Sequence, residues 1–189
     1  MNKLVRATSA LILVATLLLP LPSPCAQQTS VSEYREKANF LTGFPKFVEW
    51  PAGAFPSAEA PLLICIFGNF SFGTSLAELT RGALIRRRQV EIRWVRNEQA
   101  LRTCHILFVS RSEGKRYAKI FKAILGASVL TVGETPDFMA SGGAIDFLIE
   151  EDRQFAVNIG AANNAHLRIS SSMLALAHHV VTKMEAAKS

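Results

Sequence analysis

The chain has 189 residues, which is enough for one domain, or for one domain and a targeting segment. Apolar residues make up 49% of it and charged residues 19%, a mixture that can bury a hydrophobic core and that excludes a chain disordered throughout. The formal net charge is +6, from 21 basic and 15 acidic residues. A balance of this size favours solubility and weak attraction to acidic surfaces, and it specifies no particular partner.

The first 26 residues have the pattern of a secretory signal peptide. Lys3 and Arg6 precede an apolar stretch over residues 10–19, and small and turn-forming residues follow up to Ala26. The stretch is shorter than the roughly 20 apolar residues of a transmembrane helix. We therefore predict export, cleavage near Ala26 and a mature domain over residues 27–189. Export also excludes nucleic acid from the expected partners.

Three apolar runs predict buried strands, over residues 62–67, 103–110 and 128–132. Each run leads into a polar loop and then into a segment with helical periodicity. Residues 81–95 and 145–159 show the alternation of hairpins, the first around the basic turn 86–88 and the second around the charged turn 150–153. These elements together predict a single α/β domain with a central mixed sheet of about five to seven strands, flanked by helices.

The helices are expected on either side of these strands. A polar tail over residues 27–30 should precede a helix that begins near Ser32, carries an aromatic stripe for packing on the sheet, and is interrupted by Gly43 and Pro45. Further helices are predicted over residues 74–79, 113–125, 137–140 and 161–166. The last helix is expected over residues 171–185, with Ser170 or Ser171 as its N-cap.

No catalytic constellation is visible in the sequence. Cys104 and His105 are neighbours in a predicted strand, so their side chains point to opposite faces and cannot form a nucleophile–base pair. His178 and His179 are adjacent on a predicted helix and diverge by about 100°, whereas metal ligands on a helix favour spacings of three or four. We therefore expect no enzymatic activity, no metal and no cofactor.

The loops that follow the three buried strands are the expected interaction surface. Ligands bind at the carboxyl ends of parallel strands in sheets of this kind, which points to residues 68–72, 110–114 and 133–137. The residues named for a partner or ligand surface are Phe70, Phe72, Ser110, Arg111 and Glu134. The aromatic residues of the first helix are a second candidate for an exposed apolar patch.

After removal of the signal peptide, Cys65 and Cys104 are the only cysteines, in an oxidising compartment where a disulfide is feasible. Closing the segment between them would stabilise the fold by about 4 kcal/mol on the loop-entropy model. The expected geometry is unfavourable, because Cys65 lies in the middle of its strand and Cys104 begins its own. Aligned parallel strands would then be offset by two or three residues of about 3.3 Å each, so the bond would need a shift of the chain.

Several segments of the chain resemble, in order, the YfiR family of periplasmic regulators. The resemblance spans essentially the whole mature chain, and most of the matching positions are core and turn residues. The matching segments are Glu33-Tyr-Arg-Glu-Lys-Ala-Asn-Phe-Leu-Thr-Gly-Phe-Pro-Lys-Phe-Val-Glu-Trp-Pro51, Pro61-Leu-Leu-Ile-Cys-Ile-Phe-Gly68, Cys104-His-Ile-Leu-Phe-Val-Ser110, Val129-Leu-Thr-Val-Gly133, Gly142-Gly143, the strand around Phe147, Asn158-Ile159 and Leu167-Arg-Ile-Ser-Ser171.

The resemblance implies a periplasmic α/β protein that represses an inner-membrane diguanylate cyclase by binding its periplasmic portion, which lowers cyclic di-GMP and biofilm formation. It further implies a homodimer, an outer-membrane lipoprotein as a second partner, and pairing of the cysteines that match Cys65 and Cys104. Pro45 stands where the family often has a helix former, and a second cysteine pair of a known relative has no counterpart. The alternative is a periplasmic module that binds a small molecule through the three loops at the strand ends.

Overall fold

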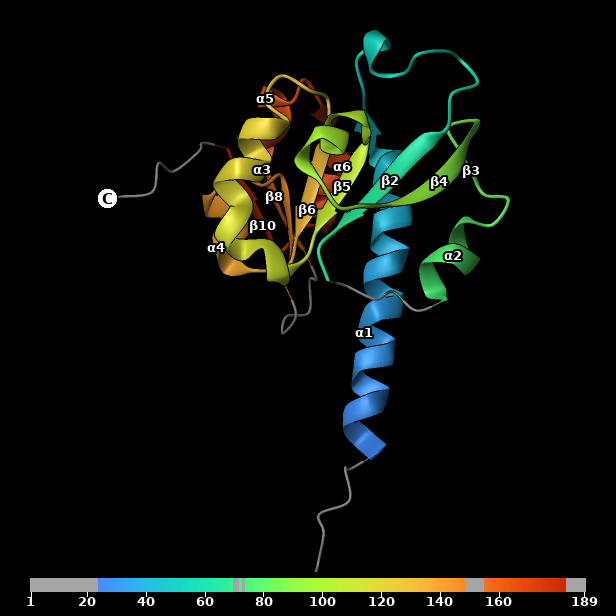
Figure 1. The fold of residues 1–189 in the computed structure, drawn as a ribbon, viewed down its shortest axis with the longest axis vertical. Coiled ribbons are helices and arrows are strands. Elements are labelled where there is room, and N and C mark those ends of the chain that lie inside the picture. The colour runs from blue at the N-terminus through green and yellow to red at the C-terminus, as the bar shows by residue number, and fades with distance from the viewer. Residues whose placement is uncertain (1–23, 70–71, 73, 149–154, 183–189) are drawn as a thin grey trace, which may run out of the picture.

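The computed structural model describes residues 24–69, 72, 74–148 and 155–182, with the backbone alone for residues 24–32. They form an α/β domain around a central mixed sheet, as the sequence predicts, although the sheet has eight strands rather than about five to seven (Figure 1). The strands, in their order across the sheet, are β10 (His179–Val181), β8 (Phe155–Asn158), β7 (Ile145–Phe147), β6 (Leu130–Gly133), β5 (Ile106–Val109), β2 (Leu62–Phe67), β4 (Arg88–Val95) and β3 (Leu84–Ile85).

The centre of the sheet is parallel and its two hairpins are antiparallel. β2 pairs in parallel with both β5 and β4, and β5 pairs in parallel with β6. The hairpins β3–β4 and β7–β8 are antiparallel, as their alternating sequences predict. The charged turn 150–153 of the second hairpin lies outside the described residues. A separate two-stranded sheet pairs β1 (Val48–Glu49) with β9 (Arg168–Ile169).

Helices cover both faces of the central sheet, so its strands are apolar on both sides. Short 3₁₀ segments join several of them to the strands: η1 (Phe44–Phe47), η2 (Ala52–Ala54), η3 (Glu98–Thr103) and η4 (Arg111–Arg116). The α-helices are α1 (Pro24–Gly43), α2 (Ser75–Thr80), α3 (Tyr117–Ala123), α4 (Pro136–Ala140), α5 (Ile159–Asn164) and α6 (Ser171–Leu176).

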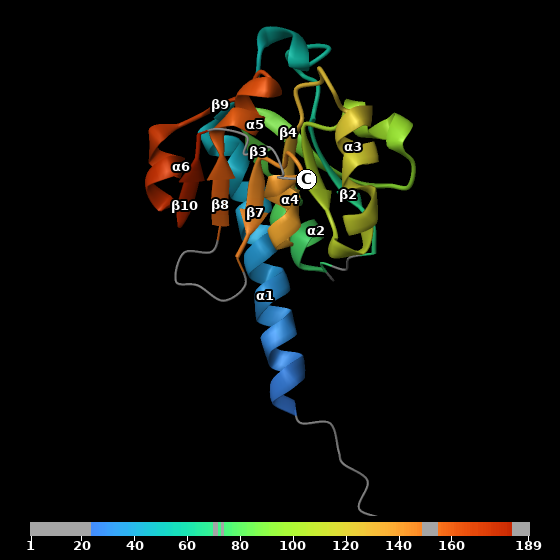
Figure 2. The same cartoon turned by 90° about the vertical axis from the view of Figure 1, so that its left-hand side faces the viewer.

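Helix α1 is longer than the sequence predicts, and part of it projects away from the sheet. It begins at Pro24, so the expected polar tail over residues 27–30 is helical, and Ser32 lies inside the helix rather than at its N-cap. No proline or glycine stands between Cys25 and Thr42, so nothing in that stretch breaks the helix. The amino-terminal half extends beyond the domain in both views (Figures 1 and 2). The helix ends at Gly43, and Pro45 lies in η1, as predicted.

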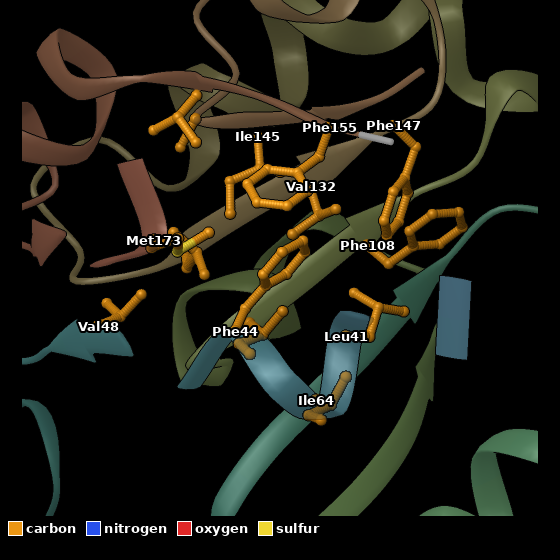
Figure 3. Close-up of a cluster of buried hydrophobic side chains, with 14 of the residues drawn as sticks. Leu41, Phe44, Val48, Ile64, Phe108, Val132, Ile145, Phe147, Phe155 and Met173 are labelled. Atoms are coloured by element: carbon orange, nitrogen blue, oxygen red, sulfur yellow. The ribbon is translucent and has the colours of Figure 1, made fainter. Parts of the chain in front are cut away.

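The larger hydrophobic cluster lies between the sheet and the face formed by α1, α2 and α6. Alternate strand residues point into it, such as Ile64 of β2 and Phe108 of β5, and Phe44 of η1 and Met173 of α6 close it from outside (Figure 3). All four side chains are buried. The aromatic stripe of the first helix is therefore mostly core, which is its usual role in an α/β domain.

A second cluster fills the opposite face, beneath η3, α3 and α4. It contains the strand residues of the other parity, among them Cys65 and Leu107, together with Leu101 of η3 and Phe138 of α4. Gly133 is required here because a β-carbon at this position would lie 2.2 Å from the Phe138 ring. The two clusters show that strand alternation divides the apolar residues between two covered faces.

The end of the chain differs from the predicted helix over residues 171–185. Ser170 caps α6 by accepting a hydrogen bond from the Met173 backbone N–H, as expected, but α6 stops at Leu176. His179, Val180 and Val181 then form β10, which pairs in parallel with β8. The adjacent β-branched residues pack well in a strand, and the open edge of β8 supplies backbone partners that a helix would not use. His178 and His179 therefore never share a helix.

Candidate functional site

An apolar hollow lies between α1 and α6 in the described part of the chain. Its volume is about 240 Å³. Its walls come from the last turn of α1, from η1, from β8 and from two residues of α6, so segments far apart in the sequence build it. Asn39, Phe40, Gly43, Phe44, Phe47, Phe155, Met173 and Leu176 line what we call the α1–α6 hollow, and all but Asn39 are apolar or glycine.

Three phenylalanine rings pack against one another in the wall of this hollow. Phe40 lies 5.7 Å from Phe44 and 5.4 Å from Phe155, and Phe44 lies 5.2 Å from Phe155, measured between ring centroids. The first pair is stacked and the other two are edge-on, and such pairs at these distances are favourable beyond the area they bury. Leu176, which also lines the hollow, is 58% exposed, so the apolar surface of the hollow continues to the outside of the domain. The first-helix aromatics thus form a concave apolar surface rather than a protruding patch.

A buried ion pair fixes α1 to the carboxyl end of the central strands. The Lys37 Nζ of α1 lies 2.8 Å from the Glu134 Oε2 just after β6, and both side chains are almost fully buried. Glu33, one turn earlier on α1, lies 2.6 Å from the same Nζ. The other carboxylate oxygen of Glu134 accepts a hydrogen bond of 3.0 Å from the Arg111 backbone N–H. Because both charges are paired and bonded, the cost of burying them is offset.

Asp146 of β7 is a second buried carboxyl near this ion pair. Burial, together with the charge of Glu134, raises the pKa of Asp146 to about 7, although the Thr135 backbone N–H and the charge of Lys37 act in the opposite direction. Its Oδ1 has no hydrogen-bond partner among the described residues. The nearby negative charge of Glu134 disfavours ionisation of Asp146, because like charges repel. The carboxyl end of the sheet therefore contains a group that titrates near neutral pH.

The residues predicted for a partner surface are mostly internal. Phe72, Ser110 and Glu134 are 2%, 0% and 3% exposed, so they do not form a surface, and only Arg111 presents an exposed side chain. Phe70 lies outside the described residues. The carboxyl ends of the strands do meet, as predicted, but α1 covers them through Lys37. Sequence reasoning missed this because strand order indicates which loops converge and not which distant helix lies over them.

Hydrogen bonds join two of the three loops to each other. The Ser110 hydroxyl donates to the Asn69 carbonyl at 3.0 Å, and the Ser112 hydroxyl accepts from the Asn69 N–H at 2.9 Å. Gly68 allows this close approach: its φ is +99°, and a β-carbon there would lie 2.7 Å from the Ser112 Oγ. These bonds tie the loop after β2 to the loop after β5.

Toward the opposite end of the strands, Cys65 in the middle of β2 and Cys104 just before β5 form a disulfide with a Cα–Cα distance of 5.8 Å. The prediction that an offset along aligned strands would hinder the bond is wrong, because β5 begins at Ile106 and not at residue 103. Residues 98–103 form η3, and Leu101 and Cys104 pack in the same cluster as Cys65. The chain therefore approaches Cys65 over the face of the sheet rather than along the strand, and no shift is needed.

His105 has a structural role beside this disulfide. Its Nδ1 accepts a hydrogen bond of 3.0 Å from the Leu63 N–H, so its Nε2 carries the proton and donates to the Ala54 carbonyl at 3.2 Å. The ring also stacks on Phe55 at 4.1 Å between centroids. Burial lowers the pKa of His105. The imidazole is consequently neutral and joins the loop over residues 51–61 to the sheet.

Neither a metal site nor a membrane-spanning helix is present in the described part of the chain. No group of three or more histidine, cysteine, aspartate or glutamate side chains gathers there in a way that would hold a metal ion. Within residues 24–182, apart from the gaps, no helix has the length and apolar character needed to cross a membrane.

Sequence reasoning did not single out three residues that shape these sites: Lys37, Asp146 and Leu176. A lysine inside an apolar helical stripe was the one available signal.

Comparison with known proteins extends these observations. No curated protein matches the chain. A crystal structure of a conserved domain protein from Vibrio cholerae O1 biovar El Tor is similar in fold, with a TM-score of 0.52, 10% sequence identity and coverage of 78% of this chain. The match covers 60% of that protein, so this chain spans less than two thirds of its length. At this identity the likeness concerns the fold alone.

The family model of the YfiR/HmsC-like proteins matches residues 34–178. This range begins in α1 before Lys37, ends after α6, and includes both cysteines of the disulfide. It covers well over half of the chain, and it contains every residue that lines the α1–α6 hollow. The chain belongs to the YfiR/HmsC-like family, a family of periplasmic regulators of diguanylate cyclases.

Proposed function

We propose that this protein is a periplasmic repressor that binds the periplasmic sensor portion of an inner-membrane diguanylate cyclase and thereby lowers cyclic di-GMP signalling and biofilm formation. Family membership supports this role. The proposal includes export with cleavage near Ala26, a position that falls in the first turn of α1. An outer-membrane lipoprotein is the proposed second partner, which would relieve the repression.

The α1–α6 hollow is the observation that carries the proposal. Its aromatic floor is preformed, and its rim exposes Leu176, so a partner can insert an apolar side chain without first opening the domain. Asn39 at the edge offers an amide that can bond to a partner's backbone. Burying one leucine or phenylalanine in such a hollow contributes about 2 kcal/mol. The surrounding surface of α1 adds further contact area.

Repression by binding requires a preference for one state of the cyclase. A partner that bound both states of the sensor equally would shift nothing, whereas a preference of about 3 kcal/mol shifts the balance more than a hundredfold. A rigid hollow suits this task because it accepts only a sensor conformation that presents the matching side chain. The protein needs no catalytic group, and its disulfide and ion pair serve to keep the binding face in place.

Binding to periplasmic cyclase domains tests the proposal. The protein purified from the periplasm is titrated by calorimetry with the periplasmic domain of each membrane cyclase encoded in its source genome. We expect one domain to bind, and Leu176→Glu to weaken that binding at least tenfold, because the carboxylate would have to be buried against Phe47 and Met173. Leu125→Glu is the matched control, since Leu125 is 77% exposed and lies beside α3, away from the hollow.

The possible outcomes separate the function from the site. If no cyclase domain binds, the repressor function is wrong. If a domain binds and Leu176→Glu has no more effect than Leu125→Glu, the function stands and the α1–α6 hollow is not its site. The small-molecule alternative receives no support from the loops at the strand ends, because Ser110, Ser112 and Asn69 bond to one another.

A further inference from the structure

Positive charge is concentrated in one segment of the chain. Residues 27–189 contain 19 basic and 15 acidic residues, a net charge of +4. Residues 75–96 contain six arginines and two glutamates, which is also +4, so the remainder of residues 27–189 is neutral in sum. These residues form α2, β3 and β4 and end at Arg96, directly after β4. We call them the basic border. All six cations are arginines, whose planar guanidinium groups can bind a phosphate through two hydrogen bonds.

The basic border lies along one side of the domain. β3 is the last strand in the order of the central sheet, and it pairs only with Arg88 and Gln89 of β4. The rest of β4 has β2 on one side and, among the described residues, no strand on the other. α2 contacts β4, so the three elements form one continuous surface. Figure 1 shows them together on its right-hand side, with α3 on its left-hand side.

Most arginines of the basic border are available to an external anion. Arg88 is engaged, because its Nη1 donates to the Ala60 carbonyl at 2.7 Å, and Arg93 lies 3.7 Å from the Glu91 carboxylate. The other four are exposed, and they form no ion pair with any residue that the structure describes: Arg81, Arg86, Arg87 and Arg96. Four guanidinium groups on one side of the domain therefore keep their charge unneutralised.

The turn between β3 and β4 holds two of these arginines against the preference of the backbone. Ile85 pairs with Arg88, so Arg86 and Arg87 form a two-residue hairpin turn. Their φ values are +50° and +68°, in the left-handed region where glycine and asparagine are favoured and a long side chain is not. Residues kept in such a conformation point to a function for their side chains. Here the side chains bring two positive charges to the tip of the hairpin.

Large apolar side chains are exposed among the same arginines. Leu79 of α2, Leu84 of β3 and Trp94 of β4 are 38%, 66% and 56% exposed. They are three of the five large apolar side chains that are exposed in the described part of the chain. Tryptophan and leucine beside basic residues are typical of surfaces that lie in the headgroup region of a membrane. The apolar groups reach the acyl boundary there, while the cations stay at the level of the phosphates.

We propose that the basic border binds peripherally to a membrane surface rich in anionic phospholipids. The four unpaired guanidinium groups contact the lipid phosphates, and Trp94 and Leu84 enter the headgroup region. A dissolved phosphate ion would leave the exposed apolar side chains without a role, whereas an anionic membrane engages both kinds of group. The family is periplasmic, so a membrane surface borders its compartment. No residue of the basic border lines the α1–α6 hollow, which stays free for a protein partner.

Sedimentation with lipid vesicles tests the proposal. The protein purified from the periplasm is mixed with vesicles of phosphatidylcholine, or with vesicles that also contain phosphatidylglycerol. We expect binding to the anionic vesicles alone, and a steep loss of binding as added salt screens the attraction. Each arginine removed should weaken binding about fivefold. The turn variant Arg86→Asn with Arg87→Gly should therefore bind at least tenfold more weakly, and its thermal unfolding midpoint should not fall, because Asn-Gly suits this turn.

A matched control removes the same charge from another part of the surface. Lys115 of η4 and Lys122 of α3 are exposed and lie away from the basic border. The variant Lys115→Gln with Lys122→Gln lowers the net charge as much as the turn variant does. It should bind anionic vesicles within about twofold of the wild type, because the attraction to a membrane decays over a short distance.

Tryptophan fluorescence tests the orientation of the bound protein. The chain has two tryptophans, so Trp94 is the only emitter in the variant Trp50→Phe. Its emission should shift to the blue when anionic vesicles are added. The proposal is overturned if anionic vesicles do not bind, if phosphatidylcholine vesicles bind equally, if the turn variant binds as tightly as the wild type, or if bound vesicles leave the Trp94 emission unchanged. The vesicles contain no cyclase, so these results are independent of the proposed function.

Discussion

The two ends of the parallel strands are closed by different chemistry. At the amino end a covalent bond joins Cys65 to Cys104, and a neutral His105 links the sheet to the loop before β2. At the carboxyl end an ion pair between Lys37 and Glu134 holds α1, with Asp146 beside it. We therefore expect the amino end to respond to reductants and the carboxyl end to respond to pH. The helix that bears the α1–α6 hollow depends on the second, non-covalent closure.

The largest effect is expected from opening the amino end. Replacing both Cys65 and Cys104 with alanine should lower the free energy of unfolding by about 4 kcal/mol, because the disulfide closes a segment with a sequence separation of 39. Urea unfolding followed by circular dichroism measures the loss. A reductant should lower the free energy of unfolding of the wild type to about that of the double variant, and it should leave the free energy of unfolding of the double variant unchanged. Equal stability of the oxidised and reduced wild type would contradict the pairing.

Opening the carboxyl end should have the next largest effect. Lys37→Met leaves the buried Glu134 carboxylate without its cation, and should lower the free energy of unfolding by about 3 kcal/mol. Adding Glu134→Gln to this variant removes the uncompensated charge, so the double variant should be more stable than the single one. Urea unfolding of the four proteins gives the coupling energy of the pair. A double variant that is less stable than Lys37→Met would show that no such coupling exists.

The pH dependence should also arise at the carboxyl end. The pKa of Asp146 is about 7 in the folded protein and 3.8 in its ordinary state, so the folded state binds the proton more tightly. Stability contributed by this group is therefore present at low pH and is lost as the pH rises from about 4 to 7. Asp146→Asn should raise the free energy of unfolding by about 2 kcal/mol at pH 8, because it removes a buried charge. The gain is only partial, because the amide still places a polar atom where Asp146 Oδ1 has no hydrogen-bond partner.

The measurement for Asp146 is a comparison of unfolding midpoints at pH 5 and pH 8. The unfolding midpoint of Asp146→Asn should depend less on pH than that of the wild type. The midpoints of the two proteins should be closer to each other at pH 5 than at pH 8. Glu134 and Lys37 also face the group, so Lys37→Met serves as a second background in which the pKa of Asp146 should rise further. A wild type whose stability grows between pH 5 and pH 8, with Asp146→Asn unchanged, would refute this.

The smallest effect concerns a single hydrogen bond at the amino end. The Trp50 indole N–H donates to the Ser128 carbonyl at 3.1 Å, just before β6. Trp50→Phe keeps the aromatic contact with Phe55 and removes the donor, so it should lower the free energy of unfolding by about 1 kcal/mol. Thermal unfolding should show this small decrease at every pH. A loss as large as that of the disulfide would mean that packing, and not the hydrogen bond, is the main contribution.

Short-range pattern was sufficient for most of the elements. The strand over residues 62–67 has the predicted bounds, the hairpin around residues 86–88 has the predicted form, and Gly126 ends the helical region after α3 in a conformation with φ of +74°. Each of these features rests on residues close together in the chain, such as alternating apolar side chains or a glycine at a helix end. The fold class and the family follow from the same local signals taken in order.

The site depended on contacts that no local pattern contains. Lys37 looks like an ordinary polar break in an amphipathic helix until Glu134, 97 residues later, is placed beside it. Residues 177–182 have helical periodicity, but the free edge of β8 offered backbone partners, and β10 formed there instead. Cys104 reaches Cys65 because η3 lies across the face of the sheet. Local sequence determined the elements, and burial of shared surfaces between distant segments decided where charges, cysteines and the α1–α6 hollow came together.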